Sequence, residues 1–511
     1  MNMKRKLAKV LALAMTACTL GSATGCFLLP QETLEPGTIY ISLWDSGWGS
    51  DWLKEMAQEF SKEYPQYTVK YEASTAEGDI TNLLPNPDQH EYDIIMGCST
   101  NPTLYDVYYE KLDDVVNSRY KNESKTIGEK IGPELLSMLV NADGHYDKLC
   151  FGAGYYNIIY KTDIYEKYDY EVPNTTNEFV TLVNQMKDDD VVPFIHFING
   201  GYWHSMLWTW AIQYAGMEDF YSMSQNPTLA ALVSDENGIP QGLDVLYSLL
   251  GNSNNYYTGS SGMDFTDAQS QFLAPAKKVG AEIAMMVNGG WMENELKNSE
   301  DELNDNVSVM KTPVVSSIIN KCPTINDDET LSAVIDAIDK NQTSYEGVSA
   351  ADFELIRTAR KVEVSNAPGL EICIPNYCDE KEGAKEFVKF FYSDKGLKIW
   401  FDKTHVRQFA DFDDSSIRLS TAGLSKFEKS QLELAKKSTP VAEGRTHASH
   451  IIYITGGASL VAGYDNAGYV ANMVKQPPES SDIIWANIKA KLNKDWTTYW
   501  KNAGLTAPEE E

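Results

Sequence analysis

An alternating strand, followed by a helix, a second strand and a buried apolar third strand, restricts the fold of this chain most strongly. In the first strand Ile39, Ile41 and Leu43 fall on one face, as in a half-buried strand. The four segments occupy residues 38–44, 50–64, 69–73 and 93–97. Their order and spacing predict an α/β fold with parallel strands, because a parallel pair needs a long crossover that a helix can fill.

The ends of two predicted strands carry candidate binding residues. In open α/β sheets, ligands bind just beyond the carboxyl ends of the strands. Trp44, Asp45 and Trp48 lie at the end of the first strand, and Ser99 follows the 93–97 strand. We therefore expect these two loops to meet at one site.

Length and charge limit the class of protein. The chain has 511 residues, too many for one ordinary core, so two lobes are expected. Its formal net charge of −30 repels phosphate backbones and argues against nucleic acid as a partner. The chain also lacks a basic patch for anionic lipids, so attachment to a membrane would have to come from a covalent lipid.

Residues 1–25 have the layout of a bacterial secretion signal: basic residues, a short apolar run, then small residues before Cys26. The apolar run is too short to span a bilayer as a mature helix. The stretch ending in Cys26 is similar to a lipoprotein cleavage site, at which the cysteine receives a lipid. Residues 26–37 are then a tether from that anchor, on the outer face of the cell membrane. An ordinary secreted protein, cut near the same place, is the alternative.

Motifs for catalysis or for a phosphate site are missing from the sequence. It contains no G-x-S-x-G, H-E-x-x-H or G-x-x-x-x-G-K-[ST] pattern. The cysteines show no spacing typical of a metal site. Cys373 and Cys378 are candidates for a disulfide, although buried free thiols are the preferred interpretation. We therefore expect no enzyme, no cofactor and no metal.

Two glycine-rich segments stand out further along the chain. Residues 151–154 are apolar and glycine-rich, which suits a crossing between lobes. An apolar strand at residues 281–287 stops at Asn288-Gly289-Gly290-Trp291. A tryptophan after such a turn can project its ring into a cleft.

Several motifs follow one another in the order in which they occur in a known protein family. They are residues 39–44 (IYISLW) with 63–65 (EYP), 92–96 (YDIIM), 143–146 (DGHY) with 152–161 (GAGYYNIIYK), 284–291 (AMMVNGGW) and 383–390 (GAKEFVKF). Together they resemble the extracellular solute-binding proteins of carbohydrate ABC importers, the group related to maltose-binding protein. Residues 284–291 are the most specific match.

The resemblance implies two α/β lobes, each a mainly parallel sheet flanked by helices, that close around a ligand by a hinge motion. The N-terminal lobe would comprise residues 38–150 and 309–403. The second lobe would comprise residues 151–308 and 404–511, which include the C-terminal helices. Residues 323–366 are polar with helical composition and are interpreted as an insertion in the first lobe.

Sugars offer apolar faces on which aromatic rings stack, and hydroxyl groups that planar polar side chains bind. Trp291 matches the stacking tryptophan of the family and is the leading candidate. The other candidate ligand-binding residues are Trp44, Asp45, Trp48, Ser99, Tyr155, Tyr156, Asn157, Tyr202, Trp203, Asn288 and Glu293. For each of them, a role in the core or in a turn is the alternative.

The leading hypothesis is a lipid-anchored, monomeric receptor that captures a sugar or an oligosaccharide and delivers it to the permease subunits of an ABC transporter. A binding protein of the same fold for a peptide or another small molecule is the first alternative. A secreted enzyme acting on glycosides is the second alternative, although no pair of carboxylates stands out.

Overall fold

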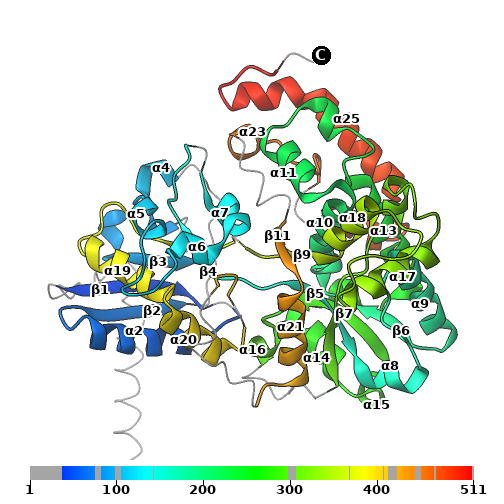
Figure 1. The fold of residues 1–511 in the computed structure, drawn as a ribbon, viewed down its shortest axis with the longest axis horizontal. Coiled ribbons are helices and arrows are strands. Elements are labelled where there is room, and N and C mark those ends of the chain that lie inside the picture. Colours follow the sequence, from blue (N-terminus) through cyan, green and yellow to red (C-terminus); the bar gives the residue numbers. More distant parts are fainter. Residues whose placement is uncertain are drawn as a thin grey trace, which may run out of the picture.

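The computed structural model describes residues 37–45, 47–74, 82–97, 105–141, 143–296, 306–367, 369–406, 408–411, 423–443, 451–464 and 468–508. Two lobes lie side by side, each built on its own β-sheet (Figure 1). The predicted two-lobe α/β architecture is confirmed. The signal segment, Cys26 and Ser99 lie outside the described residues.

The sheet of the first lobe has the strand order β2-β1-β3-β10-β4. Its strands are β1 (Thr38–Trp44), β2 (Thr68–Ser74), β3 (Ile94–Gly97), β4 (Leu149–Gly152) and β10 (Leu370–Cys373). β1 pairs in parallel with β2 and β3, whereas β10 runs antiparallel to β3 and β4. The sheet is therefore mixed rather than mainly parallel, because β10 arrives from the second lobe and runs in the opposite direction.

The helices of the first lobe cover both faces of this sheet. The apolar stripe of α2 (Asp51–Glu63) is buried and includes Trp52 and Phe60, and this helix packs against α20 (Asp394–Thr404). α19 (Lys381–Phe391) packs against both. The remaining helices, on the other side of the sheet in Figure 1, are α4 (Tyr105–Tyr108), α5 (Asp113–Val116), α6 (Ile127–Ile131) and α7 (Pro133–Leu139).

The sheet of the second lobe has the strand order β6-β7-β5-β8. Its strands are β5 (Tyr156–Lys161), β6 (Val192–Ile195), β7 (Ile283–Gly289) and β8 (Val307–Met310). Only β6 and β7 pair in parallel, and β5 runs antiparallel to both β7 and β8. The parallel pair places the carboxyl ends of β6 and β7 at the same edge of the sheet.

Most helices belong to the second lobe. The long C-terminal helix α25 (Ser481–Asn502) packs along α13 (Ile239–Leu250), which packs on α10 (Trp203–Ala215). The others are α8 (Thr162–Tyr168), α9 (Thr176–Asp188), α11 (Met217–Gln225), α12 (Leu229–Leu232), α14 (Phe265–Leu273), α15 (Ala276–Val279), α16 (Met292–Leu296), α17 (Asp328–Asp339), α18 (Ala350–Lys361), α21 (Lys426–Lys436), α23 (Ile451–Ile454) and α24 (Gly468–Val474).

The inserted segment 323–366 is helical, as its composition indicates, but it does not lie in the first lobe. β8 pairs with β5, and α18 packs on α10, so residues 309–366 are built onto the second lobe. The chain returns to the first lobe only at β10. The expected assignment of residues 309–403 to the N-terminal lobe is therefore wrong for its first part, because the strand that begins it completes the second sheet.

Three connections join the lobes: β4 to β5, β9 (Val362–Ser365) to β10, and α20 to α21. The first two are tied together, since Gly154 N donates to Asn366 Oδ1 at 2.8 Å and Asn366 N donates to Gly154 O at 3.1 Å. The third is tied to the first by a hydrogen bond from Gln408 Nε2 to Phe151 O. β9 also pairs in parallel with β11 (Thr439–Ala442), which forms a short ribbon between the two large sheets (Figure 1).

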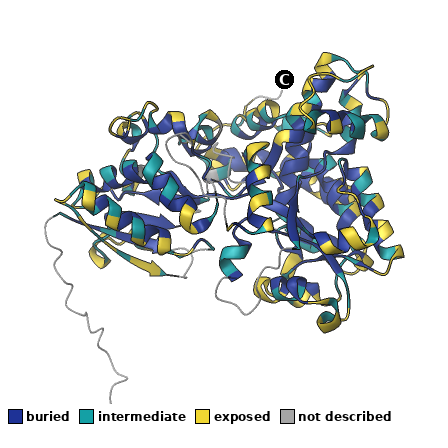
Figure 2. Cartoon of the chain, turned by 60° about the horizontal axis from the view of Figure 1, so that its bottom comes forward, coloured by how far each residue is buried: buried dark blue, intermediate teal, exposed yellow. Residues whose placement is uncertain are grey.

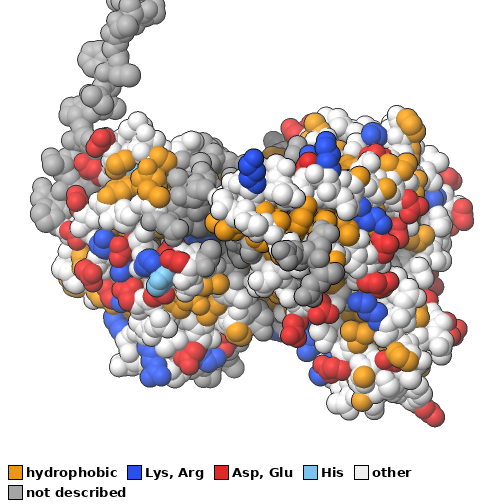
Figure 3. Space-filling view, turned by 90° about the horizontal axis from the view of Figure 1, so that it is seen from above, with side chains coloured by type: hydrophobic (Ala, Val, Ile, Leu, Met, Phe, Trp, Pro, Cys, Tyr) orange, Lys and Arg blue, Asp and Glu red, His pale blue; other side chains and the backbone are white. Residues whose placement is uncertain are grey.

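One apolar core runs through both lobes and includes Trp48, Phe151 and Trp291. A second, smaller core fills the other side of the β5–β7 pair and includes Tyr155 and Met286. Buried residues follow most strands of both sheets, except the edge strand β2, while exposed ones follow the outer helix faces (Figure 2). Acidic and basic side chains are interspersed over the face seen in Figure 3.

Candidate ligand-binding site

Trp48 and Trp291, which the sequence places at the ends of two strands, meet across the two lobes. Trp48 stands in the loop after β1, and Trp291 follows β7. Their ring centroids are 5.9 Å apart with an interplanar angle of 75°. Only 5% of Trp48 and 7% of Trp291 is exposed, so both rings are enclosed by protein.

Tyr156 and Tyr202 join these two tryptophans, and we call the four residues the aromatic cluster. Trp291 lies 5.3 Å from Tyr156 and 5.9 Å from Tyr202, with interplanar angles of 81° and 88°. Tyr156 and Tyr202 are themselves 5.2 Å apart. Such edge-to-face contacts are the favoured arrangement of aromatic rings. Four of the sequence-predicted aromatic residues are thus brought to one place, whereas Trp203 and Tyr155 face elsewhere.

Glycines make room for the aromatic cluster. A Cβ atom at Gly47 would lie 2.9 Å from Cδ1 of Trp291, and one at Gly154 would lie 3.1 Å from Cη2 of Trp48 and 3.3 Å from Cε3 of Trp291. A Cβ atom at Gly152 would lie 2.9 Å from Nε1 of Trp48. The glycine-rich crossing at residues 151–154 therefore serves close packing of the indole rings as well as a change of lobe.

Trp203 does not contribute to the cluster. It is the first residue of α10, is 1% exposed, and packs edge-to-face against Phe194 at 4.9 Å. Tyr202 is the N-cap of the same helix and points to Trp291 instead. The prediction that Trp203 contacts a ligand is corrected, because the first helical residue turns into the core while the cap residue faces the other lobe.

Tyr155 also faces away from the aromatic cluster. Its ring lies 5.0 Å from Phe409 and belongs to the smaller core of the second lobe. Burial raises its pKa well above the usual range of a phenol. Its carbonyl accepts hydrogen bonds from Gly290 N at 3.0 Å and from Asn157 Nδ2 at 3.1 Å. The contribution of Tyr155 is thus to hold the turn before Trp291.

Asn157 and Asn288 face each other across the β5–β7 pair and are both buried. Asn288 Oδ1 accepts from Gly289 N at 2.7 Å, so this side chain stabilises the turn that leads to Trp291. Both asparagines are engaged with the backbone of the strand ends. Neither is placed as an exposed partner for a ligand hydroxyl.

Asp45 and Trp44, at the end of β1, are both half-buried. Asp45 N donates to Ser74 O at 2.6 Å, and burial, with Asp51 nearby, raises the pKa of the Asp45 carboxyl. Glu293 lies on α16 and accepts a hydrogen bond from Ser425 Oγ at 2.8 Å. Asp45 therefore stays a candidate for hydrogen bonding to a ligand, while Glu293 has a role within the protein.

A small cavity lies behind the cluster, between the lobe connections and α21. It is lined by Gly154, Tyr155, Asn157, His405, Val406, Phe409, Gln431, Leu432, Leu434 and Ala435. Its volume of about 20 Å³ holds about one water molecule. A sugar ring does not fit in this cavity, which is lined by neither Trp48 nor Trp291.

Sequence reasoning missed the groups that surround the predicted rings. Trp400 is fully buried and lies 5.7 Å from Trp48. Gly47 closely approaches Trp291, Gln431 donates to Gly290 O, and Asn294 donates to Thr404 O. Of the three, only Gly47 gave a signal in the sequence, as a glycine between two predicted site residues. Contacts such as these come from segments far apart in the chain.

Within the described segments, the cysteines are unpaired and no metal-binding cluster is present. Cys150, Cys322, Cys373 and Cys378 are free thiols, so Cys373 and Cys378 are not paired. In the part of the chain that the structure describes, no group of three or more His, Cys, Asp or Glu side chains is arranged to hold a metal ion.

Solved structures with the same fold include several sugar-binding proteins. A chitin oligosaccharide binding protein is 13% identical, with a TM-score of 0.57 over 90% of this chain and 100% of its own. RafE in complex with raffinose is 14% identical, with a TM-score of 0.55 over 89% and 99%. A maltose-bound T. maritima protein is 15% identical, with a TM-score of 0.56 over 89% and 99%. At these identities the likeness establishes the fold.

The family model for bacterial extracellular solute-binding proteins matches residues 46–398. The chain therefore belongs to this family, and its family and neighbours are binding proteins. A comparison with curated proteins gives no match. Among the helices in the described ranges, none is both long and apolar enough to cross a membrane.

Proposed function

We propose that this protein is an extracellular receptor that captures a sugar or an oligosaccharide between its lobes and delivers it to an ABC transporter permease. The contact of Trp48 with Trp291 across the lobes carries the proposal. It brings one aromatic ring from each lobe to the carboxyl ends of the strands, where ligands of α/β proteins bind. A sugar that enters between these rings is stacked from both lobes.

The roles within the site follow from geometry. Trp291, Tyr156 and Tyr202 provide the aromatic surface on the second lobe, and Trp48 provides it on the first. Asp45, at the end of β1, supplies a carboxylate for ligand hydroxyl groups. Neighbours of the same fold include proteins bound to maltose and raffinose, in keeping with this class of ligand.

Thermal unfolding of residues 27–511 with a panel of mono- and oligosaccharides tests the proposal. A ligand that binds only the folded state at a hundred times its Kd adds about 2.7 kcal/mol to the free energy of unfolding. A raised midpoint with one glycan family, smaller in the Trp291→Ala variant, would identify the ligand class. If no sugar raises the midpoint and a peptide panel does, the ligand is not a carbohydrate.

The same samples distinguish a receptor from an enzyme. A receptor leaves the glycan intact, so the supernatant should contain no newly formed reducing ends after long incubation. Release of reducing sugar from any glycan that raises the midpoint would replace the receptor proposal with a glycoside-acting enzyme.

We also propose that Cys26 carries a lipid that anchors the mature, monomeric chain to the outer face of the cell membrane. The order of basic, apolar and small residues before Cys26 supports it. Mass spectrometry of the chain purified from membranes should give an N-terminal peptide that begins at Cys26 and carries acyl chains. A Cys26→Ala variant found in the medium, together with an unmodified wild-type peptide, would favour an ordinary secreted protein.

A further inference from the structure

The short helix α16, which follows Trp291 directly, is hydrogen-bonded to both lobes. Asn294 Nδ2 donates to the carbonyl oxygen of Thr404 at 3.0 Å. Thr404 is the last residue of α20, which packs on the first lobe. On the other side, Ser425 Oγ donates to Glu293 Oε2 at 2.8 Å, and Ser425 is the N-cap of α21 on the second lobe. In Figure 1, α16 lies between α20 and α21.

The turn before Trp291 is also held by α21. Gln431 Nε2, on α21, donates to Gly290 O at 3.1 Å, while Gly290 N donates to Tyr155 O at 3.0 Å. Both polar groups of the Gly290 backbone are therefore paired. A Cβ atom at Gly290 would lie 2.7 Å from Gln431 Oε1, so the glycine permits this close approach. Trp291 is fixed by Gln431 before it and by α16 after it.

The partner of Asn294 is rigidly placed on the first lobe. Thr404 is 1% exposed, and its hydroxyl donates to Trp400 O at 2.9 Å. Trp400 is fully buried and packs on both Trp48 and Trp52. The hydrogen bond from Asn294 therefore joins the Trp291 helix to the element that also supports Trp48. It joins α16 to α20 in the arrangement of the lobes seen here.

We propose that Asn294 and Gln431 are positioning residues for Trp291. Gln431 fixes the turn that orients the indole ring, and Asn294 couples that orientation to the approach of the first lobe. This inference rests on the proposed function, because it assigns its residues to a ring that stacks on the ligand. It adds to that function a link between lobe closure and the shape of the stacking surface.

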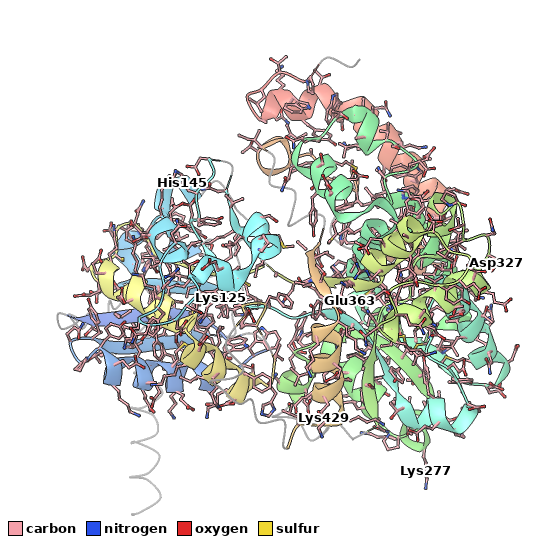
Figure 4. All side chains as sticks on the ribbon, viewed as in Figure 1. Lys125, His145, Lys277, Asp327, Glu363 and Lys429 are labelled. Atoms are coloured by element: carbon pink, nitrogen blue, oxygen red, sulfur yellow. The ribbon has the colours of Figure 1, made fainter. Side chains whose placement is uncertain are left out.

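Isosteric variants of the full chain test the proposal. Gln431→Glu and Asn294→Asp keep the side-chain volume but place a carboxylate oxygen against a carbonyl oxygen. Removal of one such hydrogen bond is expected to weaken glycan binding about tenfold in each variant. Lys429→Ala, an exposed position on α21 (labelled in Figure 4), is the matched control and should change affinity less than twofold. If Gln431→Glu does not fold, Gln431→Met takes its place.

A double-mutant cycle separates positioning from a general structural role. In a Trp291→Ala background, the Gln431 and Asn294 variants should lower affinity by less than twofold, because the ring that they position is absent. Equal fold-changes in the two backgrounds would overturn the proposal.

A measurement without ligand keeps this inference separate from the proposed function. The emission of Trp291 is obtained as the difference spectrum between a protein and the same protein carrying Trp291→Phe. This difference spectrum should shift when Gln431→Glu is introduced and stay constant when Lys429→Ala is introduced. A shift without binding of any glycan would support the positioning role while the sugar proposal fails. Identical difference spectra would overturn the positioning role, whatever the chain binds.

Discussion

At the scale of single residues, the position of the Trp291 ring is set by its neighbours. Three aromatic rings meet it nearly edge-to-face, and Gly47 and Gly154 approach it where a side chain would collide. Aromatic contacts of this kind contribute about 0.5–1.5 kcal/mol each beyond the apolar area that they bury. The ring is thus held in place before any ligand arrives.

Gly47→Val should disturb the site more than the fold. The new Cβ would lie 2.9 Å from Cδ1 and 3.1 Å from Cβ of Trp291, so either the loop after β1 or the indole must move. We expect at least tenfold weaker glycan binding by calorimetry. Gly262→Val is the matched control, since nothing lies within 4 Å of its Cβ position. Equal affinity of the two variants would argue against close approach at Gly47.

Trp291→Ala should weaken ligand binding, whereas Trp203→Ala should lower the stability of the fold. Trp203 is almost fully buried in the core of the second lobe, so its removal is expected to lower the free energy of unfolding by about 3–5 kcal/mol. Trp291→Ala should reduce glycan affinity tenfold or more in a protein that still folds. Chemical denaturation and calorimetry on both variants check this, and a binding loss confined to the Trp203 variant would reverse the assignment.

Glu363 gives the protein a pH-dependent contribution to stability. It is buried in the middle of the molecule (Figure 4), accepts hydrogen bonds from Thr312 N at 2.8 Å and Thr312 Oγ1 at 2.6 Å, and faces Lys311 and Arg360. Burial nevertheless raises its pKa from 4.5 to about 7. The folded state therefore holds this proton more tightly than the unfolded chain does.

The sign of the effect follows from that difference. Between about pH 4.5 and pH 7 the folded state keeps a proton that the unfolded chain has lost, so stability falls as pH rises, by up to about 1.4 kcal/mol per unit. Glu363→Gln cannot ionise and should lack this slope. Denaturation of both proteins at pH 5 and pH 8 measures it, and a pH-independent difference between them would contradict the prediction.

The residues of the aromatic cluster could be found from the sequence because aromatic side chains next to strand ends or glycine turns are a local signal. Trp48, Tyr156, Tyr202 and Trp291 all carry it. Orientation is not local, since Tyr202 and Trp203 are adjacent in the chain and yet face different environments. Gln431 and Asn294 show no local pattern, because each matters through a backbone carbonyl far along the chain.

At the scale of elements, the strands with clear alternation or with apolar runs were predictable. β1, β3 and β7 appear close to their expected bounds. β9, β10 and β11 have only four residues each and are identified by their partners rather than by their own pattern. The position of the 323–366 segment was missed for a related reason, since composition predicts helices but not the lobe that they cover.

The start of α9 connects the second lobe to the inserted helices. Thr175 is fully buried, accepts from Glu178 N at 3.2 Å as the N-cap of α9, and donates to Asp328 Oδ2 on α17 at 2.6 Å. Thr175→Ala should therefore lower the free energy of unfolding by about 2 kcal/mol, the upper range for a lost cap. Thr228→Ala removes an exposed cap of α12 without a second partner and should cost less. Equal losses in denaturant melts would show that the bond to Asp328 contributes nothing.

At the scale of the whole molecule, hydrogen bonds from the backbone and from the side chains of Asn366 and Gln408 tie the three connections to one another. Asn366→Ala removes the acceptor of Gly154 N and leaves the reverse bond from Asn366 N intact. We expect looser coupling of the lobes, seen as a larger radius of gyration by small-angle X-ray scattering in the absence of ligand. An unchanged scattering curve would mean that the remaining contacts between the lobes suffice.

The position of β10 has a consequence for the order in which the chain folds. β10 stands between β3 and β4, although more than 200 residues separate it from β4 in the sequence. The chain is synthesised from its N-terminus, so the other four strands of the first sheet are made long before β10. Until most of the second lobe has been synthesised, β3 and β4 each leave unpaired the edge that later pairs with β10. Such non-local pairing slows folding and makes this interval the stage at which protection from aggregation matters most.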